Sequence, residues 1–488
     1  MSIEGLSDDA FAWYRLAGPN PNAICKCTPE VLSKVGALGQ AKYTALRAEL
    51  ERLQAAGELF AVDYTVLSGV IPGDPKEIPQ FLPSPIALFR LNADAAARAR
   101  MPITPVLVQV KADAQDLVLQ PDVKKQYLGD AFTSADGAPD FSWLIAKTCL
   151  QVADSVYHQG FTHLGRTHLV AEAFATAAHR QLSERHPLHR LLMPHFQGTL
   201  LINSLASRTL IDENKPVDIL LAPNLPQLYE LVTADVSAWK SRDWSPDAVL
   251  ARQGMTASEF PHMFPYRDDA MKVWEAIKTW VAAYMHISYR DDHVLLERDV
   301  EVQAWIAELK TTGDVKWLAE AWGPKGHNNL PLLTHLVSTV IFTASAQHGA
   351  VNFPQLSVAY TPAFPYALYS EIPTDGEPKT ETQYLDLLAP MEIAKLQRVV
   401  FLLLSSVYHT RLGHYSHPLS FRRYFESRAA RRAAAQFRAD LARIGRDIDA
   451  RNAALVDAWV EAGKPRKEAA LWRYLHLHPD KIPQSINI

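Results

Sequence analysis

Apolar residues recur three and four residues apart over most of the chain, the spacing that places side chains on one face of a helix. The pattern predicts helices at Thr44 to Ala56, Asp140 to Tyr157, Ala171 to Glu184, Asp269 to His286, Asp299 to Thr311, Leu333 to His348 and Glu392 to Val407. Strand-like runs are few, and three of them predict a small sheet: Phe60 to Val70, Ile86 to Leu91 and Pro105 to Val110. Because neither a repeat nor a long linker divides the chain, we expect a mainly α fold, a single large helical domain with a small β element near its N-terminus.

Two apolar stretches raise the question of a membrane span. The longer one, Leu330 to Ala346, is interrupted by His335 and several hydroxyl side chains. It falls short of the roughly 20 apolar residues that a spanning helix needs. The shorter run, Val399 to Val407, predicts a buried helix segment. We therefore expect both stretches to lie in the core of a soluble protein.

The segment from Phe421 to Arg451 is rich in arginine, with nine arginines against four acidic residues. An arginine-rich amphipathic helix can lie on an anionic membrane surface, so contact with a membrane or with phospholipid is one interpretation. The other is the solvated face of a long surface helix whose alanines pack inward. The sequence favours the second interpretation, because the acidic residues are mixed with the arginines along the segment.

Charge and cysteine content exclude some function classes. The net charge of -4 and the pI near 6.5 argue against a nucleic-acid partner, because nucleic-acid-binding proteins usually carry a basic excess. Cys25, Cys27 and Cys149 are too few and too scattered for a disulfide framework. The N-terminus carries acidic residues where a secretory signal would have a basic region, so we expect a cytoplasmic location.

Histidines provide the main chemical clue. Of the 18 in the chain, seven fall between residues 158 and 195, namely His158, His163, His168, His179, His186, His189 and His195. Neutral imidazole is a common ligand of divalent first-row metals, so this region is a candidate metal site. His163 and His168 are five residues apart, which is about 140° around a regular α-helix. A π-type bulge would bring them to nearly the same face.

His348 and Asn352 are four residues apart, the spacing that shares a face on an ordinary α-helix. Two helices can therefore supply two ligands each.

Three sequence signatures resemble those of the lipoxygenase family. The spacing H-x4-H-x4-H-x17-H-x8-H is met in full from His158 to His195. The stretch Ser345 to Gln355 resembles the second metal-binding helix of the family, and Ile482 to Ile488 is similar to its terminal sequence. The resemblance begins near Asp9 and implies a lipoxygenase catalytic domain over residues 1–488 without the N-terminal lipid-binding β-barrel domain, as in compact bacterial-type members.

The resemblance implies a metal site and residues that support it. The implied ligands are His163, His168, His348, Asn352 and the main-chain carboxylate of Ile488. Such nitrogen and oxygen donors suit non-haem iron, and manganese is an accepted substitute. Further implied residues are His158, Gln159 and Gln355, with Gln355 holding the side chain of Asn352 and both glutamines linking the metal ligands to the substrate cavity.

The implied activity is that of a dioxygenase that inserts O2 into polyunsaturated fatty acids of the linoleate or arachidonate type. The product would be a hydroperoxide formed at a cis,cis-1,4-pentadiene. Ala206 stands where the family's alanine is associated with S-configured product, and Leu210 is expected to contact the pentadiene. The alternatives are a lipid hydroperoxide isomerase with the same iron site and a catalytically silent lipid-binding relative. Residues 373–423 match the family poorly, so no pocket residue is assigned there.

Overall fold

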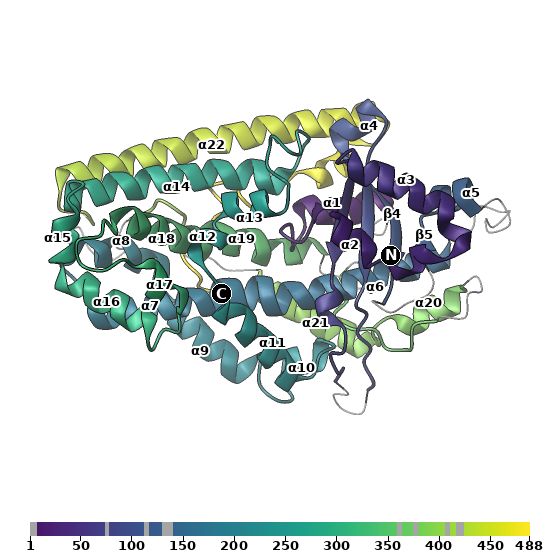
Figure 1. The fold of residues 1–488 in the computed structure, drawn as a ribbon, viewed down its shortest axis with the longest axis horizontal. Coiled ribbons are helices and arrows are strands. Elements are labelled where there is room, and N and C mark those ends of the chain that lie inside the picture. The colour runs from purple at the N-terminus through teal and green to yellow at the C-terminus, as the bar shows by residue number, and fades with distance from the viewer. Residues whose placement is uncertain are drawn as a thin grey trace.

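Helices make up most of the part of the chain that the computed structural model describes, residues 7–73, 78–111, 117–128, 140–358, 364–373, 379–405, 410–415 and 424–488 (Figure 1). The α-helices are α1 (Asp8–Ala17), α2 (Pro29–Ser33), α3 (Thr44–Ala55), α4 (Ala95–Arg100), α5 (Pro121–Leu128), α6 (Phe141–Tyr157), α7 (Val170–Gln181), α8 (Pro187–Phe196), α9 (Thr199–Thr209), α10 (Pro216–Leu220), α11 (Leu225–Ser237), α12 (Ser241–Trp244), α13 (Pro246–Arg252), α14 (Pro265–Tyr289), α15 (His293–Glu297), α16 (Val300–Lys310), α17 (Trp317–Ala321), α18 (Leu330–Phe342), α19 (His348–Asn352), α20 (Glu381–Leu387), α21 (Met391–Leu404), α22 (Arg428–Glu461) and α23 (Arg466–Ala469). Two π-helices, η7 (His158–Leu169) and η8 (Thr343–Gln347), continue α6 and α18. The mainly α prediction is confirmed.

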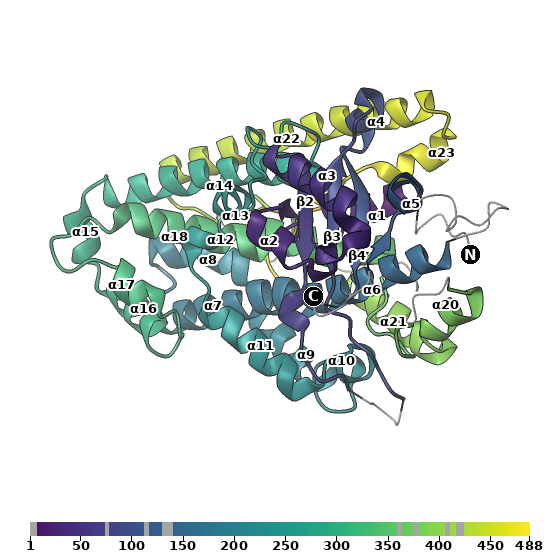
Figure 2. The same ribbon diagram turned by 45° about the vertical axis from the view of Figure 1, so that its right-hand side comes forward.

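A small antiparallel sheet lies at one end of the molecule, with strands β1 (Cys25–Lys26), β2 (Leu59–Asp63), β3 (Ile86–Leu91), β4 (Ile103–Gln109) and β5 (Val118–Leu119) in that spatial order. Side chains alternate between its two faces. Leu59 and Ala61 pack into the cluster that contains the apolar side of α3, whereas Phe60 and Val62 join the core of the helical body. Figure 2 shows α2 and α3 in front of the sheet. The sheet is therefore buried on both faces.

The predicted strand from Phe60 to Val70 is wrong in its second half. Strand β2 ends at Asp63, and a 3₁₀ turn follows at Thr65–Leu67. Asp63 Oδ1 accepts hydrogen bonds from the backbone N–H of Thr65 at 2.9 Å and from its hydroxyl at 2.7 Å. This local side-chain bond turns the backbone out of the sheet, in the way that Asp commonly initiates turns.

All seven predicted helical regions are helical, with ends shifted by a few residues. The prediction of a buried segment from Val399 to Val407 is wrong for the part that the structure describes. In α21, Val400 and Phe401 are buried, but Val399 and Leu403 are 51% and 64% exposed. Consecutive apolar residues on a helix point in all directions around its axis. Only those on the side that packs against the core are buried. Val407 lies outside the described residues.

Two long helical segments run through the centre. One comprises α6, η7 and α7, and the other comprises α18, η8, α19 and the 3₁₀ turn η9 (Phe353–Val358). The stretch Leu330–Leu356 is long and apolar enough to cross a membrane by length and composition alone, yet 72% of its most apolar window is buried inside the protein. It is a core helix, as the sequence predicts.

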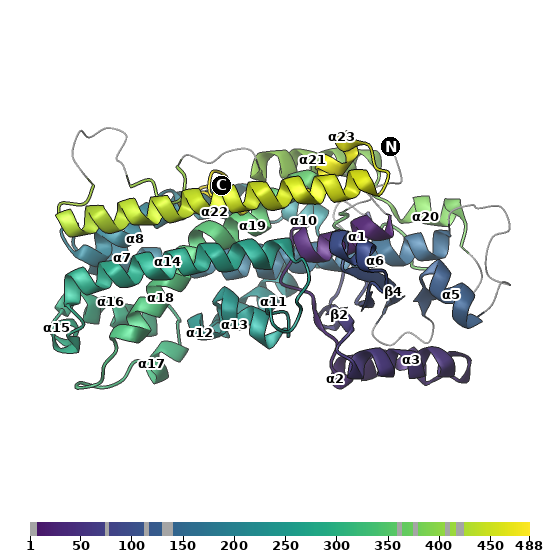
Figure 3. The ribbon, with the colours of Figure 1, turned by 90° about the horizontal axis from the view of Figure 1, so that it is seen from above.

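The arginine-rich segment forms the long helix α22, which lies beside α14 on one side of the molecule (Figure 3). Ser427 caps its start by accepting a hydrogen bond from the Ala430 N–H. Its apolar face, with Phe437 and Leu441 at its middle, is buried in the core. The face that a membrane-binding helix would offer to lipid is thus already covered, in agreement with the surface-helix interpretation.

Candidate metal centre

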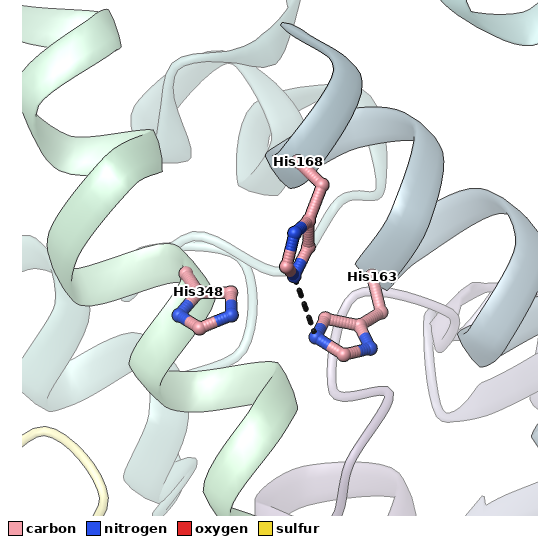
Figure 4. A group of neighbouring side chains, drawn as sticks. All are labelled: His163, His168 and His348. Carbon is pink, nitrogen blue, oxygen red and sulfur yellow. Dashed lines mark hydrogen bonds between the residues drawn. The ribbon is translucent and has the colours of Figure 1, made fainter. Parts of the chain in front are cut away.

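Three histidine side chains from the two central segments converge inside the protein (Figure 4). His163 and His168 come from η7, and His348 begins α19. The ring centroids lie 4.9 Å apart for His163 and His168, 5.4 Å for His163 and His348, and 5.0 Å for His168 and His348. One nitrogen of each ring lies within 4.8 Å of the other two. All three side chains are buried.

The π-helical conformation of η7 accounts for the pairing of His163 with His168. A π-helix has a wider turn than an α-helix, so residues five apart come to nearly the same face. The predicted π-bulge is therefore confirmed. A second π-helical turn, η8, directly precedes His348. Both segments that carry the histidines thus depart from α-helical geometry where they meet.

Hydrogen bonds fix which ring nitrogens of His163 and His168 face each other. Nδ1 of His168 lies 2.8 Å from Oδ1 of Asn203, whose amide nitrogen is oriented by Glu172 at 2.8 Å. Nδ1 of His163 lies 3.3 Å from Oε1 of Gln159. Both acceptors are carbonyl oxygens, so both Nδ1 atoms carry the proton and both Nε2 atoms present lone pairs.

The two Nε2 atoms lie 3.3 Å apart and have no proton to share (Figure 4). Two lone pairs at this distance repel each other unless a cation lies beside both. Metal–imidazole bonds are about 2.1 Å long, so two such ligands at right angles have nitrogens about 3 Å apart. The spacing of His163 and His168 therefore fits a shared metal ion.

His348 completes the trio of histidines, and both of its ring nitrogens are uncommitted. Its side chain is fully buried, and neither Nδ1 nor Nε2 has a hydrogen-bond partner among the described residues. Burial lowers the pKa of His168 to about 4 and holds those of His163 and His348 well below their usual range. All three imidazoles are neutral near pH 7, the form that binds metals. Buried polar atoms without partners are costly, and a metal ion would satisfy one of the two nitrogens of His348.

A chain of amide hydrogen bonds joins His163 to Asn352. Nε2 of Gln159 donates to Oε1 of Gln355 and to the hydroxyl of Tyr366. Nε2 of Gln355 in turn donates to Oδ1 of Asn352 at 3.0 Å. Asn352, one turn after His348, is fully buried, and its Nδ2 donates to the carbonyl of Leu404 at 2.6 Å. The structure thus places Gln159 and Gln355 between two of the predicted ligands.

Comparison with known proteins identifies the family. The family model described as Lipoxygenase matches residues 109–479. The chain belongs to the lipoxygenase family. It is 33% identical over 494 residues to a linoleate 9/13-lipoxygenase of Pseudomonas aeruginosa, a match that covers 99% of this chain and 66% of that protein. It therefore spans slightly less than two thirds of that relative.

Two further relatives extend the comparison. A mouse (Mus musculus) hydroperoxide isomerase ALOXE3 is 28% identical, over 99% of this chain and 62% of that protein. The crystal structure of a coral 8R-lipoxygenase superimposes with a TM-score of 0.80 at 26% identity, covering 99% of this chain and 66% of the coral chain. The fold described above is therefore the lipoxygenase fold.

The other histidines of the lipoxygenase signature lie outside the trio. Nε2 of His158 lies 2.8 Å from the carbonyl of Val351 and so joins η7 to α19. His186 caps the start of α8 and pairs with Asp299 at 2.9 Å. His195 lies 2.9 Å from the carbonyl of Gln484 and 3.2 Å from the Tyr415 hydroxyl. These three side chains tie together elements that are distant in the sequence.

The C-terminal segment runs beside the trio. Ile486 packs against Ala171 and Ala344, from the same two central segments that carry the three histidines. Its carbonyl accepts a hydrogen bond from the Thr199 hydroxyl at 2.9 Å. Gly198 has φ +85°, and a Cβ built there would lie 3.2 Å from the Cβ of Asn487. The last residue, Ile488, is half-buried.

Of the predicted pocket residues, Ala206 lies in α9 and Leu210 directly follows that helix. Asn203 points to His168. Ala206 follows Asn203 by three residues and Leu210 follows Ala206 by four, so all three share one face of the helix. Both Ala206 and Leu210 are half-buried, whereas Leu201 and Leu205 on the outer face are 66% and 46% exposed.

Two supporting residues were given no role in the sequence analysis. Asn203 fixes the ring of His168, and Tyr366 accepts a hydrogen bond from Gln159. Asn203 is 35 residues from its histidine and Tyr366 is 207 residues from its glutamine. No local spacing connects such pairs, so only the folded chain reveals them.

The buried His195 should make the stability of the metal-free protein depend on pH. Burial lowers its pKa from 6.5 to about 4, so the unfolded chain binds more protons between these values. Stability is then lost as the pH falls from 6.5 towards 4, by about 1.4 kcal/mol per pH unit for this one group. In urea unfolding from pH 7 to 5, His195→Gln should flatten the dependence by that amount. The same change at exposed His327 should leave it unaltered.

Proposed function

We propose that this protein is a non-haem iron dioxygenase that adds O2 to polyunsaturated fatty acids. The observation that carries the proposal is the pair of unprotonated Nε2 atoms of His163 and His168, 3.3 Å apart beside the uncommitted nitrogens of His348. The proposed ligands are these three histidines, Asn352 and the carboxylate of Ile488. Three imidazoles with two oxygen donors suit iron, and manganese is accepted by the same set.

Bound there, the metal supplies the one-electron chemistry that removes hydrogen from a cis,cis-1,4-pentadiene and allows O2 to add. The chain's own residues orient the donors. Asn203 holds His168, Gln159 holds His163, and Gln355 holds the amide of Asn352. Ligands whose second polar atom is hydrogen-bonded keep their tautomer and orientation, which tunes the metal they bind.

The substrate is proposed to be a fatty acid of the linoleate or arachidonate type. A named relative acts on linoleate, and it matches 99% of this chain. Leu210, directly after α9, is partly buried and packs against the core, so it offers apolar surface to an acyl chain. Apolar walls with few polar groups are typical of lipid-binding cavities.

We also propose a cytoplasmic location.

Ala206 is proposed to direct O2 to one face of the bound chain. Its methyl group lies one turn from Asn203 on the inner face of α9, and removing it opens space at that position. Ala206→Gly should therefore shift the product from mainly S to a substantial R fraction, about a tenfold or greater change in the S:R ratio, equivalent to about 1.4 kcal/mol between two transition states. Chiral chromatography of the hydroperoxides measures it. Ser207→Gly, on the exposed side of the helix, is the matched control. An unchanged ratio in Ala206→Gly contradicts this role.

The direct test is oxygen uptake by the purified, untagged protein with linoleate and with arachidonate, alongside conjugated-diene absorbance and metal analysis. Uptake with diene formation and about one iron per chain supports the dioxygenase. Iron without uptake refutes it and favours the hydroperoxide isomerase, the activity named for a relative at 28% identity. A lipid hydroperoxide as substrate then tests that activity. A protein that binds fatty acid but turns over neither substrate is the silent lipid-binding relative.

A further inference from the structure

The π-helix η7 has a second face that repeats every five residues. Gly160 and Gly165 have the same spacing as His163 and His168, so each pair forms its own stripe along η7. The glycine stripe contacts α11, whereas the histidine stripe contacts α19. These two helices lie on different sides of the α6–η7–α7 segment (Figure 1).

Helix α11 approaches η7 closely at the glycines. A Cβ built at Gly160 would lie 3.0 Å from Cδ1 of Leu228 and 3.4 Å from Cγ2 of Val232. A Cβ built at Gly165 would lie 3.3 Å from Cγ2 of Val236. A methyl group at either position would therefore crowd the side chains of α11, which would have to shift by a few tenths of an ångström to admit it. The α11 residues are spaced by four, so they form one apolar face.

An arginine on η7 anchors the same face of α11. Nε and Nη2 of Arg166 donate to the two carboxylate oxygens of Asp235 at 2.8 and 2.7 Å, and Nη2 also donates to the Tyr157 hydroxyl at 3.0 Å. The guanidinium carbon lies 3.9 Å from the ring centroid of Trp244. Both charged side chains are largely shielded from solvent, at 15% and 16% exposed. A two-point, shielded pair of this kind fixes geometry better than an exposed one.

We propose that α11 is a clamp that holds η7 in its π-helical turn, and that Gly160, Gly165 and Asp235 are positioning residues for His163 and His168. The inference rests on the metal centre proposed above. If η7 relaxed to an α-helix, residues five apart would separate by about 140°, which would split the histidine stripe and the glycine stripe together. Contact with α11 therefore selects the same backbone conformation that pairs the two imidazoles.

The test compares Gly160→Ala and Asp235→Asn with the wild-type protein in metal-free form. Titration with cobalt(II) should give an affinity about tenfold or more lower for each variant, with an altered visible absorption spectrum, because changes in residues that orient metal ligands typically cost about 10–100-fold. Adding Leu228→Val to Gly160→Ala removes the atom nearest to the new methyl group. This second change should restore affinity and spectrum towards wild type.

Asp269→Asn is the matched control for stability. It breaks a buried ion pair in which Arg451 of α22 lies 2.6 Å from Asp269 of α14, a contact that does not involve η7. This variant should lower the unfolding temperature but keep the wild-type cobalt affinity and spectrum. If Gly160→Ala and Asp235→Asn lower the unfolding temperature but bind cobalt with wild-type affinity and spectrum, the clamp is overturned.

Hydrogen exchange tests the clamp independently of metal binding. In the metal-free protein, amides of residues 158–169 should exchange faster in Gly160→Ala and Asp235→Asn than in wild type, and no faster in Asp269→Asn. If the wild-type protein binds no cobalt, the metal-centre proposal fails, and the exchange comparison still decides the clamp. Unchanged exchange across η7 in both variants would overturn it.

Discussion

Replacing His348 by leucine should abolish metal binding and raise, not lower, the unfolding temperature of the metal-free protein. The side chain is fully buried, and both ring nitrogens lack a partner among the described residues. An unsatisfied buried polar group costs about 1–3 kcal/mol, and leucine removes that cost while keeping most of the volume. Metal analysis and calorimetry of the metal-free protein measure the two effects.

His186→Leu is the control for removing a buried imidazole. His186 pairs with Asp299 at 2.9 Å and caps α8 through the Leu188 N–H at 3.1 Å, so its loss leaves partners unsatisfied. It should destabilise the protein by about 1–3 kcal/mol and leave the metal content unchanged. A His348→Leu protein that keeps its metal, or that destabilises as His186→Leu does, contradicts the assignment of His348 as a ligand.

Residues appended after Ile488 should reduce metal content and activity about tenfold or more, in the range seen when residues that support a metal site are lost. The extension converts the free carboxylate into a peptide carbonyl and removes a negative charge from the donor set. It must also fit beside Asn487, which lies so close to Gly198 that a Cβ built there would be 3.2 Å from the Cβ of Asn487. Metal analysis and oxygen uptake of matched preparations measure the loss.

The matched control carries the same extension at the N-terminus and should retain wild-type metal content and uptake. A protease site placed between Ile488 and the extension provides a second comparison. Cleavage there removes most of the extension but leaves a few residues after Ile488, so it should not restore the carboxylate ligand. Full iron content and full turnover in the C-terminally extended protein would refute the carboxylate ligand.

Local chemistry made much of this fold predictable from sequence. The five-residue spacing of His163 and His168 fits only a π-helical turn if both are to hold one ion, and η7 has that conformation. The strand that ends at Asp63 shows the limit of apolar pattern: residues up to Val70 remain strand-like in composition, but the side chain of Asp63 bonds Thr65 and ends the strand. A short polar side chain outweighs the apolar pattern there.

Long-range partners could not be predicted. The amide of Asn203 meets His168 only because α9 folds back over η7, and Asp235 meets Arg166 across 69 residues of sequence. The spacing of Gly160 and Gly165 was visible in the sequence, but its meaning depends on α11 lying against them. Tertiary packing, which the pattern of a single segment does not contain, decides such pairs.

The packing of Ile486 on Ala171 and Ala344 has a consequence for synthesis on the ribosome. More than 300 residues separate Ala171 from Ile486, so the groove that receives Ile486 stays open until almost the whole chain has emerged. During that time Ile486 does not cover the two alanines. Metal loading is then expected to precede the docking of the C-terminal segment, which would close over an ion already bound.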